Sequence, residues 1–382
     1  MKQLSKIFSA ACALAMSVAL TMVPVTAQGK DEFVVTMISV SVYGPWFIVK
    51  EKGMAKDIDV EVKIIEDITA RNAGLSSGSI HCMMTTMDST VVTVSSGVPV
   101  RHVAVPLMSY GLDEMIADDS IQSDSDLAGK SFAADYGFLN HMWMLLTLKR
   151  AGIPLDSANH MILLPQDATA AFTSGQLDVD VNFIPFSTQS LEREGAHKLK
   201  TSRTDRTWER GLISDSIGCS SRWLDENPET AREVIRAWFE AVDWWKKNPE
   251  EGNRIIAEGL DWPEADVRLT QAGAIMLNLN QNMGAIGIEG GVPMCDSIPS
   301  DAPQPPEGSS GWGMLVGGKP DCEPGYLADT WQLFGDVYME AGVIDSITPA
   351  EDGIDNSIIE SLVAEGLDRE YDSNRWVGRL PI

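Results

Sequence analysis

Residues 73–80, AGLSSGSI, recur in pattern at residues 170–177, AAFTSGQL. Each copy has the pattern of a helix end, a glycine after it, and the start of a strand. Gly78 and Gly175 occupy the position after a helix where a left-handed backbone conformation is needed. The repeat therefore predicts two similar units of helix and strand. Chance similarity between two helix-to-strand junctions is the alternative.

Strands and helices alternate around the first copy. Apolar runs predict strands at residues 33–40, 60–65, 80–85, 101–108 and 112–117. Helices are predicted between them, over residues 46–52, 69–77 and 89–95, with Asp67 and Asp88 as N-caps and Gly53, Gly78 and Gly97 at the ends. This order is typical of a parallel sheet with helices on both faces.

The second copy lies in a similar series. Strands are predicted at residues 130–134, 160–164 and 177–182, with helices over 141–150 and 168–174 that Asn140 and Asp167 would cap. The last third is helical, with helices predicted over residues 228–247, from 249, and over 263–282, 326–341 and 356–365. The fold class is therefore α/β with a helical C-terminal segment.

Composition and charge exclude several classes of protein. The 382 residues include 55 acidic and 29 basic side chains, for a net charge of −26, and 44% are hydrophobic. Such a charge repels nucleic-acid phosphates, and eleven tryptophans argue against disorder. The length predicts about two domains. The excess of acid is typical of a solvated surface rather than a metal cage.

The N-terminus has the pattern of a secretory signal peptide. Lys2 and Lys6 precede an uncharged stretch from residue 7 to 29, and Val25-Thr26-Ala27 supplies small residues for a cut after Ala27. We therefore expect residues 1–27 to be removed and the protein to act in a bacterial periplasm. An uncleaved anchor helix and a lipoprotein modified at Cys12 are weaker alternatives.

Four cysteines remain after that cut. Cys295 and Cys322 flank a segment, residues 284–325, that is rich in Gly, Pro and Ser. We expect these two to form a disulfide, and the segment either packs as a flap or is mobile. Cys82 and Cys219 lie in apolar runs and are expected to be buried free thiols. No Cys/His cluster has metal-ligand spacing, so we expect no metal and no cofactor.

Several short motifs follow one another along the chain, at residues 44–53, 75–78 with 85–89, 109–113, 126–130, 170–175 and 227–229. Their order resembles that in the periplasmic substrate-binding proteins of ABC importers. The branch is the one with sulfonate-, taurine-, nitrate- and thiamine-precursor-binding members. The chain departs from the family in the segment 284–325 and in Gly137–His141, where many members have small Ser-rich residues.

The resemblance implies a two-lobed, type II periplasmic-binding-protein fold. Lobe one would comprise residues 28–117 and 213–382, with the insertion 284–325, and lobe two residues 118–212. The chain would cross between lobes near residues 116–118 and 212–217. In this family the lobes close over a ligand held between them.

Strand ends and helix starts next to the cleft supply the candidate ligand-binding residues. They are Trp46, Thr86, Asp88, Ser109, Tyr110, Asp113, Tyr136, Asn140, His141, Asp167 and Phe186. Each has an ordinary structural alternative: core packing for Trp46, helix capping for Asp88 and Asp167, a satisfied helix position for His141.

The resemblance and the absence of a catalytic motif predict a receptor and not an enzyme. It would bind a small polar organic solute, taurine- or sulfonate-like or otherwise nitrogen-containing, and deliver it to an ABC permease and its ATPase. We expect a monomer that binds no nucleic acid. The alternatives are a thiamine-pyrimidine-synthase-like enzyme, with His81 next to Cys82, and a periplasmic partner of a sensor.

Overall fold

The computed structural model describes residues 31–308 and 310–378. The expected signal peptide, residues 1–27, lies outside the described residues. Within the described ranges, no helix is both long enough and apolar enough to cross a membrane.

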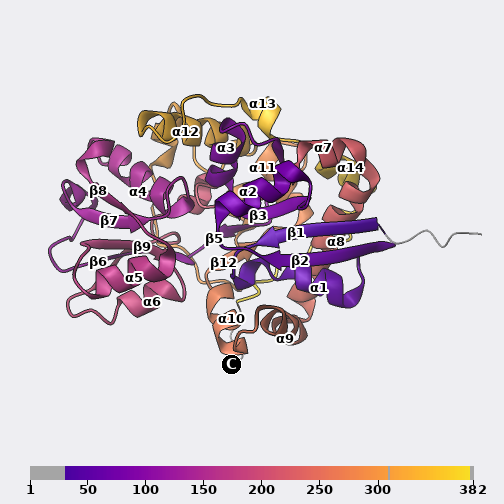
Figure 1. Cartoon of the computed structure of the whole chain (residues 1–382), viewed down its shortest axis with the longest axis horizontal. Helices are drawn as coiled ribbons and strands as arrows, with labels where there is room; N and C mark the ends of the chain where they lie inside the picture. The colour runs from indigo at the N-terminus through magenta and orange to yellow at the C-terminus, as the bar shows by residue number, and fades with distance from the viewer. Residues whose placement is uncertain (1–30, 309, 379–382) are drawn as a thin grey trace, which may run out of the picture. The chain divides into compact units, whose positions relative to one another are not determined.

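The first of two five-stranded sheets holds the strands around the first copy of the repeat (Figure 1). In spatial order they are β2 (Ile58–Ile64), β1 (Asp31–Met37), β3 (Cys82–Thr86), β11 (Asp215–Ser220) and β4 (Val100–Ala104). β1 is parallel to β2 and β3, but β11 is antiparallel to β3 and β4. The sheet is mixed because β11 enters it from a distant part of the chain.

The second sheet holds the strands around the second copy. In spatial order they are β8 (Asn159–Ile162), β7 (Ser131–Ala134), β9 (Val179–Phe183), β6 (Asp113–Ala117) and β10 (His197–Thr201). β7 is parallel to β8 and β9, whereas β6 is antiparallel to β9 and β10. Here β6 is the strand that comes from the other half of the molecule.

The two sheets have one topology. The strand orders are β2–β1–β3–β11–β4 in the first sheet and β8–β7–β9–β6–β10 in the second. In both, the fourth position is held by a strand from the other half of the molecule, β11 or β6, which we call the exchanged strand. The two copies of the repeat occupy equivalent places, because each joins the helix before the third strand, α2 (Ile68–Ser77) or α5 (Pro165–Thr173), to β3 or β9. The predicted internal repeat is therefore confirmed as a repeat of structure.

The exchanged strands fix where the chain crosses between lobes. β6 pairs with β9, so the first crossing ends near Leu112, earlier than the expected residues 116–118. The second ends at Asp215, where β11 begins and pairs with β3. We call residues 31–112 and 215–378 lobe one, and residues 113–214 lobe two.

Helices cover both sheets and form the C-terminal segment. Those not yet given are α1 (Pro45–Lys52), α3 (Met87–Ser95), α4 (Leu139–Arg150), α6 (Phe186–Ser190), α7 (Ser221–Glu226), α8 (Pro228–Lys247), α9 (Pro249–Leu260), α10 (Glu264–Gln271), α11 (Leu279–Ile286), α12 (Tyr326–Glu340), α13 (Ala350–Gly353) and α14 (Ser357–Ala364). In lobe one, α8 carries apolar side chains into a core that includes Trp238 and Trp245.

The capping predictions were right for one helix and wrong for three. The Asp67 carboxylate accepts from the backbone N–H of Ala70 and caps α2. Asp88, Asn140 and Asp167 lie inside the first turns of α3, α4 and α5. Each of these helices begins earlier than expected, so its N-cap is the residue before it, Thr86, Phe138 or Leu164.

The helix predicted over residues 263–282 is wrong, because a strand divides it. β12 (Ala274–Met276) separates α10 from α11 and pairs antiparallel with β5 (Leu107–Ser109). The break follows from Gly273, whose carbonyl accepts from the N–H groups of Tyr110 and Leu112. A Cβ at this glycine would lie 2.4 Å from the backbone of Leu112, so the first crossing segment packs directly on it.

Both cysteine pairs form disulfides. The bridge between Cys295 and Cys322 is confirmed. The expectation of free thiols at Cys82 and Cys219 is wrong, because these residues are directly opposite on β3 and β11, with their Cα atoms 4.0 Å apart. Their separation of 137 residues concealed this neighbourhood from a reading of local sequence.

The insertion, residues 284–325, packs against the protein. It includes the short 3₁₀ helix η6 (Trp312–Val316), and its Trp312 is buried. The Trp312 indole N–H donates to the carbonyl of Asp205 at 2.8 Å, and the Arg150 guanidinium lies 3.6 Å from the Trp312 ring centre. Since both partners belong to lobe two, the insertion joins the two lobes and leads into α12.

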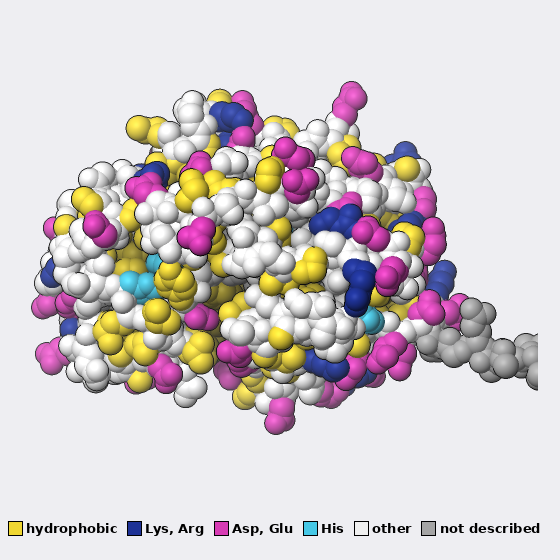
Figure 2. Space-filling model, turned by 45° about the horizontal axis from the view of Figure 1, so that its top comes forward, with side chains coloured by type: hydrophobic (Ala, Val, Ile, Leu, Met, Phe, Trp, Pro, Cys, Tyr) yellow, Lys and Arg dark blue, Asp and Glu magenta, His cyan; other side chains and the backbone are white. Residues whose placement is uncertain are grey.

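Acidic side chains are spread over the visible surface rather than gathered at one place (Figure 2). This distribution fits the prediction that the acid excess solvates the protein.

Candidate functional site

A small cavity lies where the two sheets face each other. Its volume is about 30 Å³, which is room for a water molecule or two. Lobe one supplies Ile38, Val40, Val42, Tyr43, Thr86, Leu112 and Asp215, and lobe two supplies Asp113, Phe138, Leu139 and Phe183. These residues come from strand ends and helix starts, so the cavity occupies the place where ligands bind in open α/β sheets.

Two of the predicted site residues, Thr86 and Asp113, line this cavity. Asp88 lies behind it, fully buried at the start of α3. Ser109 supports Asp113, because its hydroxyl accepts from the Asp113 backbone N–H at 3.1 Å and lies 2.7 Å from the hydroxyl of Ser202. These four residues form one group around the first crossing of the chain.

Three predicted residues of lobe two surround the start of α4 but do not line the cavity. The His141 ring lies 4.1 Å from the ring of His160 and 5.5 Å from that of Tyr136, measured between ring centres. Burial lowers the pKa of His141 to about 3, so its ring is neutral. The Tyr136 hydroxyl donates to the carbonyl of Gly342 in lobe one, and Asn140 is buried.

Four predicted residues lie elsewhere. Trp46 packs in the core of lobe one, with its ring centre 5.1 Å from that of Trp238. Tyr110 lines a groove with Lys198 and Arg203 and is not among the residues that line the cavity. Asp167 is exposed. Phe186 packs edge-on against Phe183, so it supports the cavity wall from behind.

Sequence reasoning missed Tyr43, Phe183 and Asp215. Asp215 is the first residue of β11, and it is 7% exposed. Ligand-binding residues are expected after strands of a parallel sheet, whereas Asp215 begins a strand that runs antiparallel to its neighbours. Its position equals that of Asp113, the first residue of β6, and this correspondence was the signal that could have found it.

Three carboxyl groups dominate the electrostatics of the site. Burial raises the pKa of Asp113 to about 7 and that of Asp88 to about 6. Burial also raises the pKa of Asp215 well above its ordinary value, and the neighbouring Asp113 and Asp88 raise it further. Burial raises the pKa of the Tyr43 hydroxyl, and the adjacent Asp215 adds to this effect.

Contacts between the lobes surround the cavity. The Tyr338 hydroxyl on α12 donates to Asp88 at 2.6 Å and lies 3.2 Å from the carbonyl oxygen of Phe138 in lobe two. The Ser89 hydroxyl donates to the carbonyl of Gly137, and Lys149 on α4 pairs with Glu340 on α12. The lobes are therefore closed upon each other in this structure.

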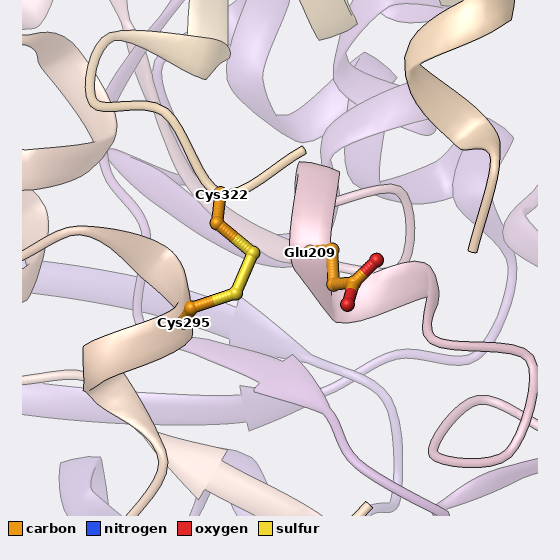
Figure 3. A group of neighbouring side chains, drawn as sticks. All are labelled: Glu209, Cys295 and Cys322. Atoms are coloured by element: carbon orange, nitrogen blue, oxygen red, sulfur yellow. A yellow bond between two sulfur atoms is a disulfide. The ribbon is translucent and has the colours of Figure 1, made fainter. Parts of the chain in front are cut away.

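One further group has metal-ligand chemistry within the described residues. Glu209, Cys295 and Cys322 place one ligand atom each within 4.8 Å of the others (Figure 3). The two sulfurs are bonded to each other and offer no thiolates. Glu209 already pairs with Arg206. This group is therefore a disulfide beside a paired carboxylate.

The chain belongs to the family described as NMT1/THI5 like, whose model matches residues 41–252, more than half of the sequence. A protein of Brucella abortus (strain 2308), named only provisionally as a binding protein, is 25% identical over 262 residues. That match covers 66% of this chain and 80% of the Brucella protein.

Solved structures share the fold. The periplasmic aliphatic sulphonate binding protein SsuA from Escherichia coli superposes with a TM-score of 0.60 at 16% identity, covering 85% of this chain and 92% of that one. The periplasmic nitrate-binding protein NrtA from Synechocystis PCC 6803 gives 0.60 at 14%, covering 90% and 91%. The predicted two-lobed periplasmic-binding-protein fold is confirmed.

Proposed function

We propose that the protein is a solute-binding receptor of an ABC importer. The observation that carries this proposal is the cavity between two sheets of equal topology, lined by polar side chains from both lobes. A solute bound there contacts both lobes at once, so binding favours the closed arrangement. Membership of the NMT1/THI5-like family and the names of the structural neighbours support the same function.

The receptor captures a small polar organic solute in the periplasm and delivers it to a permease and its ATPase. It acts as a monomer after removal of residues 1–27. The pattern of the N-terminal sequence and the periplasmic neighbours support this location. Cell fractionation tests it: the mature chain is expected in the periplasmic fraction with residue 28 at its N-terminus, and retention in the cytoplasm would contradict the proposal.

An enzyme of the pyrimidine-synthase type finds little support in this site. The residues offered for it were His81 and Cys82, but Cys82 is bound to Cys219. The His81 ring stacks on Trp223, with ring centres 5.1 Å apart, at the start of β3. The cavity is at the other end of that strand, at Thr86. The sensor alternative shares the binding step and differs only in the membrane partner.

Native mass spectrometry of the purified protein tests the binding step. We expect a retained small molecule, which is lost after partial unfolding and dialysis. Adding the released solute back should raise the melting temperature, because a ligand that binds only the folded state stabilises it. A folded protein that retains nothing and is stabilised by no member of a broad solute panel would overturn the proposal.

A further inference from the structure

The two lobes place an aspartate at the same structural position. Asp113 begins β6 and pairs with Phe183 at the end of β9, while Asp215 begins β11 and pairs with Thr86 at the end of β3. Both line the cavity, and they are 3% and 7% exposed. The repeated topology therefore brings one carboxyl group from each lobe to the same small space.

A third carboxyl group lies next to this pair. Asp88 is fully buried, and its Oδ2 accepts from the Tyr338 hydroxyl, while its Oδ1 has no hydrogen-bond partner among the described residues. The charge of Asp88 raises the pKa of both Asp113 and Asp215, so the three groups are close enough to repel one another. An unpartnered carboxylate oxygen in such a place is costly unless a ligand or a proton compensates it.

No basic side chain compensates the three carboxyl groups. None of them forms an ion pair with a Lys, Arg or His in the described part of the chain. A buried arginine, Arg71, lies near Tyr43, but it donates to the carbonyl of Met84 and does not line the cavity.

Another buried aspartate shows how this fold treats a purely structural carboxyl group. Asp180 in lobe two is fully buried and accepts from the side chains of Ser190, Thr169 and Asn182, at 2.5, 3.3 and 3.2 Å. Three donors satisfy it from within its own lobe. Asp113 and Asp215 have fewer donors beside them, Ser109 and Tyr43, and both line a cavity. Asp88 Oδ1 has no hydrogen-bond partner among the described residues, so the cleft group has acceptor capacity left over.

Three helices, α1, α3 and α4, begin beside the cavity, and helix N-termini attract anions. At α3 this attraction is already used, because the buried Asp88 carboxyl group itself lies in the first turn of the helix. The negative charge that such a helix start favours is thus supplied by the protein.

We propose that the cleft binds a small organic cation, a protonated amine or amidinium, through Asp113 and Asp215, and discriminates against oxyanions. This deepens the proposed function and rests on it. The apolar walls, with Tyr43, Phe138 and Phe183, provide a surface for the ligand's carbon atoms and aromatic faces for its charge. The cavity of about 30 Å³ means that the lobes part to admit a solute of more than a few atoms.

Matched pairs of cation and anion test the proposal on the full mature chain, stripped of retained solute, at pH 8. Acetamidine with acetate and benzamidine with benzoate have nearly the same shape and opposite charge. Nitrate, alkanesulfonates, diamines, guanidines and quaternary ammonium compounds complete the panel, and calorimetry and melting temperature are the readouts. We expect at least one cation to bind, with its matched anion bound at least about tenfold more weakly.

Two variants connect the result to the site. Asp113→Asn and Asp215→Asn keep the shape of the side chain, and each should weaken cation binding by at least about tenfold. The control is Asp156→Asn, an exposed aspartate of lobe two that does not line the cavity. Circular dichroism and intact disulfides show that each variant is folded.

The outcomes separate the inference from the function on which it rests. If the protein binds anions and rejects cations, the cation inference is overturned and the receptor proposal stands. The same holds if ligand binding is unchanged in both cleft variants. Failure of the folded protein to bind any cation overturns the cation inference. If the protein also retains no solute and is stabilised by no member of a broad panel that includes zwitterions and neutral compounds, the receptor proposal is overturned with it. Cation binding that is lost in both cleft variants and kept in the control supports both.

Discussion

The two sheets share a strand order, yet they hold their exchanged strands in different ways. In lobe one, Cys82 and Cys219 face each other across β3 and β11 and are covalently joined. The equivalent pair in lobe two is Val179 and Ala117. One residue further along the third strand, Met83 of lobe one corresponds to the hydrogen-bonded Asp180 of lobe two.

Only one position in these paired strands carries the same side chain in both lobes. It is the aspartate at the cleft end of the exchanged strand, Asp113 or Asp215. Inside each lobe, very different side chains satisfy the same backbone arrangement, because burial requires only packing and paired polar groups. The same topology therefore does not dictate which side chains fill the interior of each lobe. The aspartates that the two lobes share are instead the residues that line the cavity between them.

Removing the disulfide of lobe one should have the largest effect on stability of the changes considered for the two lobes. Replacing Cys82 and Cys219 with alanine should lower the free energy of unfolding by about 5 kcal/mol, because the bridge closes a loop with a separation of 137 residues. The control pair, Cys295 and Cys322 with a separation of 27, should cost about 3.5 kcal/mol. Urea unfolding measures both, and an equal or larger loss in the control would contradict the loop argument.

Lobe two should accept the bridge that it lacks. The double variant Ala117→Cys and Val179→Cys should form a disulfide and stabilise the protein by about 2–4 kcal/mol. The register supports this, because Asp118 N–H donates to the Asp178 carbonyl as Ser220 N–H donates to that of His81. Peptide mapping without reductant detects the bridge, and two free thiols in a folded protein would show that the sheets differ more than their pairing indicates.

The cleft aspartates should make ligand-free stability depend on pH. Burial raises the pKa of Asp113 to about 7, so the folded state binds more protons than the unfolded state between about pH 4 and pH 7. Unfolding free energy should therefore fall as pH rises through this range, by on the order of 1–3 kcal/mol, and Asp113→Asn should remove this part of the fall.

The difference between wild type and Asp113→Asn reports Asp113 together with its electrostatic coupling to neighbouring groups. Glu114, Asp88, Asp215 and Tyr43 interact with it electrostatically and are present in both. Burial lowers the pKa of His141 to about 3, which gives stability that rises with pH up to about 6.5 and cancels in the difference. Identical pH profiles for wild type and variant would show that the carboxyl is not buried as described.

The smallest effect concerns the hydroxyl that links Asp88 to lobe two. Tyr338→Phe removes the donor to Asp88 and should destabilise the ligand-free protein by about 1–2 kcal/mol. Tyr136→Phe removes a comparable contact between the lobes, to the Gly342 carbonyl, but this side chain is 45% exposed and its loss should be near zero. Thermal unfolding of both variants measures the two losses of stability. Equal losses would show that leaving the buried Asp88 carboxyl without this donor has no extra cost.

The sequence predicted the local parts of this molecule well. Gly53 and Gly78 end α1 and α2 in left-handed conformations, as expected, and Pro228 begins α8. These features depend on neighbours along the chain. The exchange of β6 and β11, the Cys82–Cys219 bridge and the role of Asp215 depend on residues about 60 to 140 positions away, which no local pattern reports.

The candidate site shows the same division. Thr86 and Asp113 were found because each lies at a strand boundary, and both line the cavity. Trp46 was selected because it follows a strand, but its large apolar ring is better placed against Trp238 in the core. The residues that decide the charge of the cleft emerge only when two distant strand starts are seen to meet.

The exchanged strands also limit how the polypeptide can be divided. A fragment that ends before residue 215 lacks β11 from the sheet of lobe one, and a fragment that begins after residue 117 lacks β6 from that of lobe two. No single cut therefore yields two pieces that each contain a complete sheet. When synthesis has reached residue 200, every strand of lobe two is present except the end of β10. Lobe one still lacks β11, so the edge of β3 that pairs with β11 is unpaired.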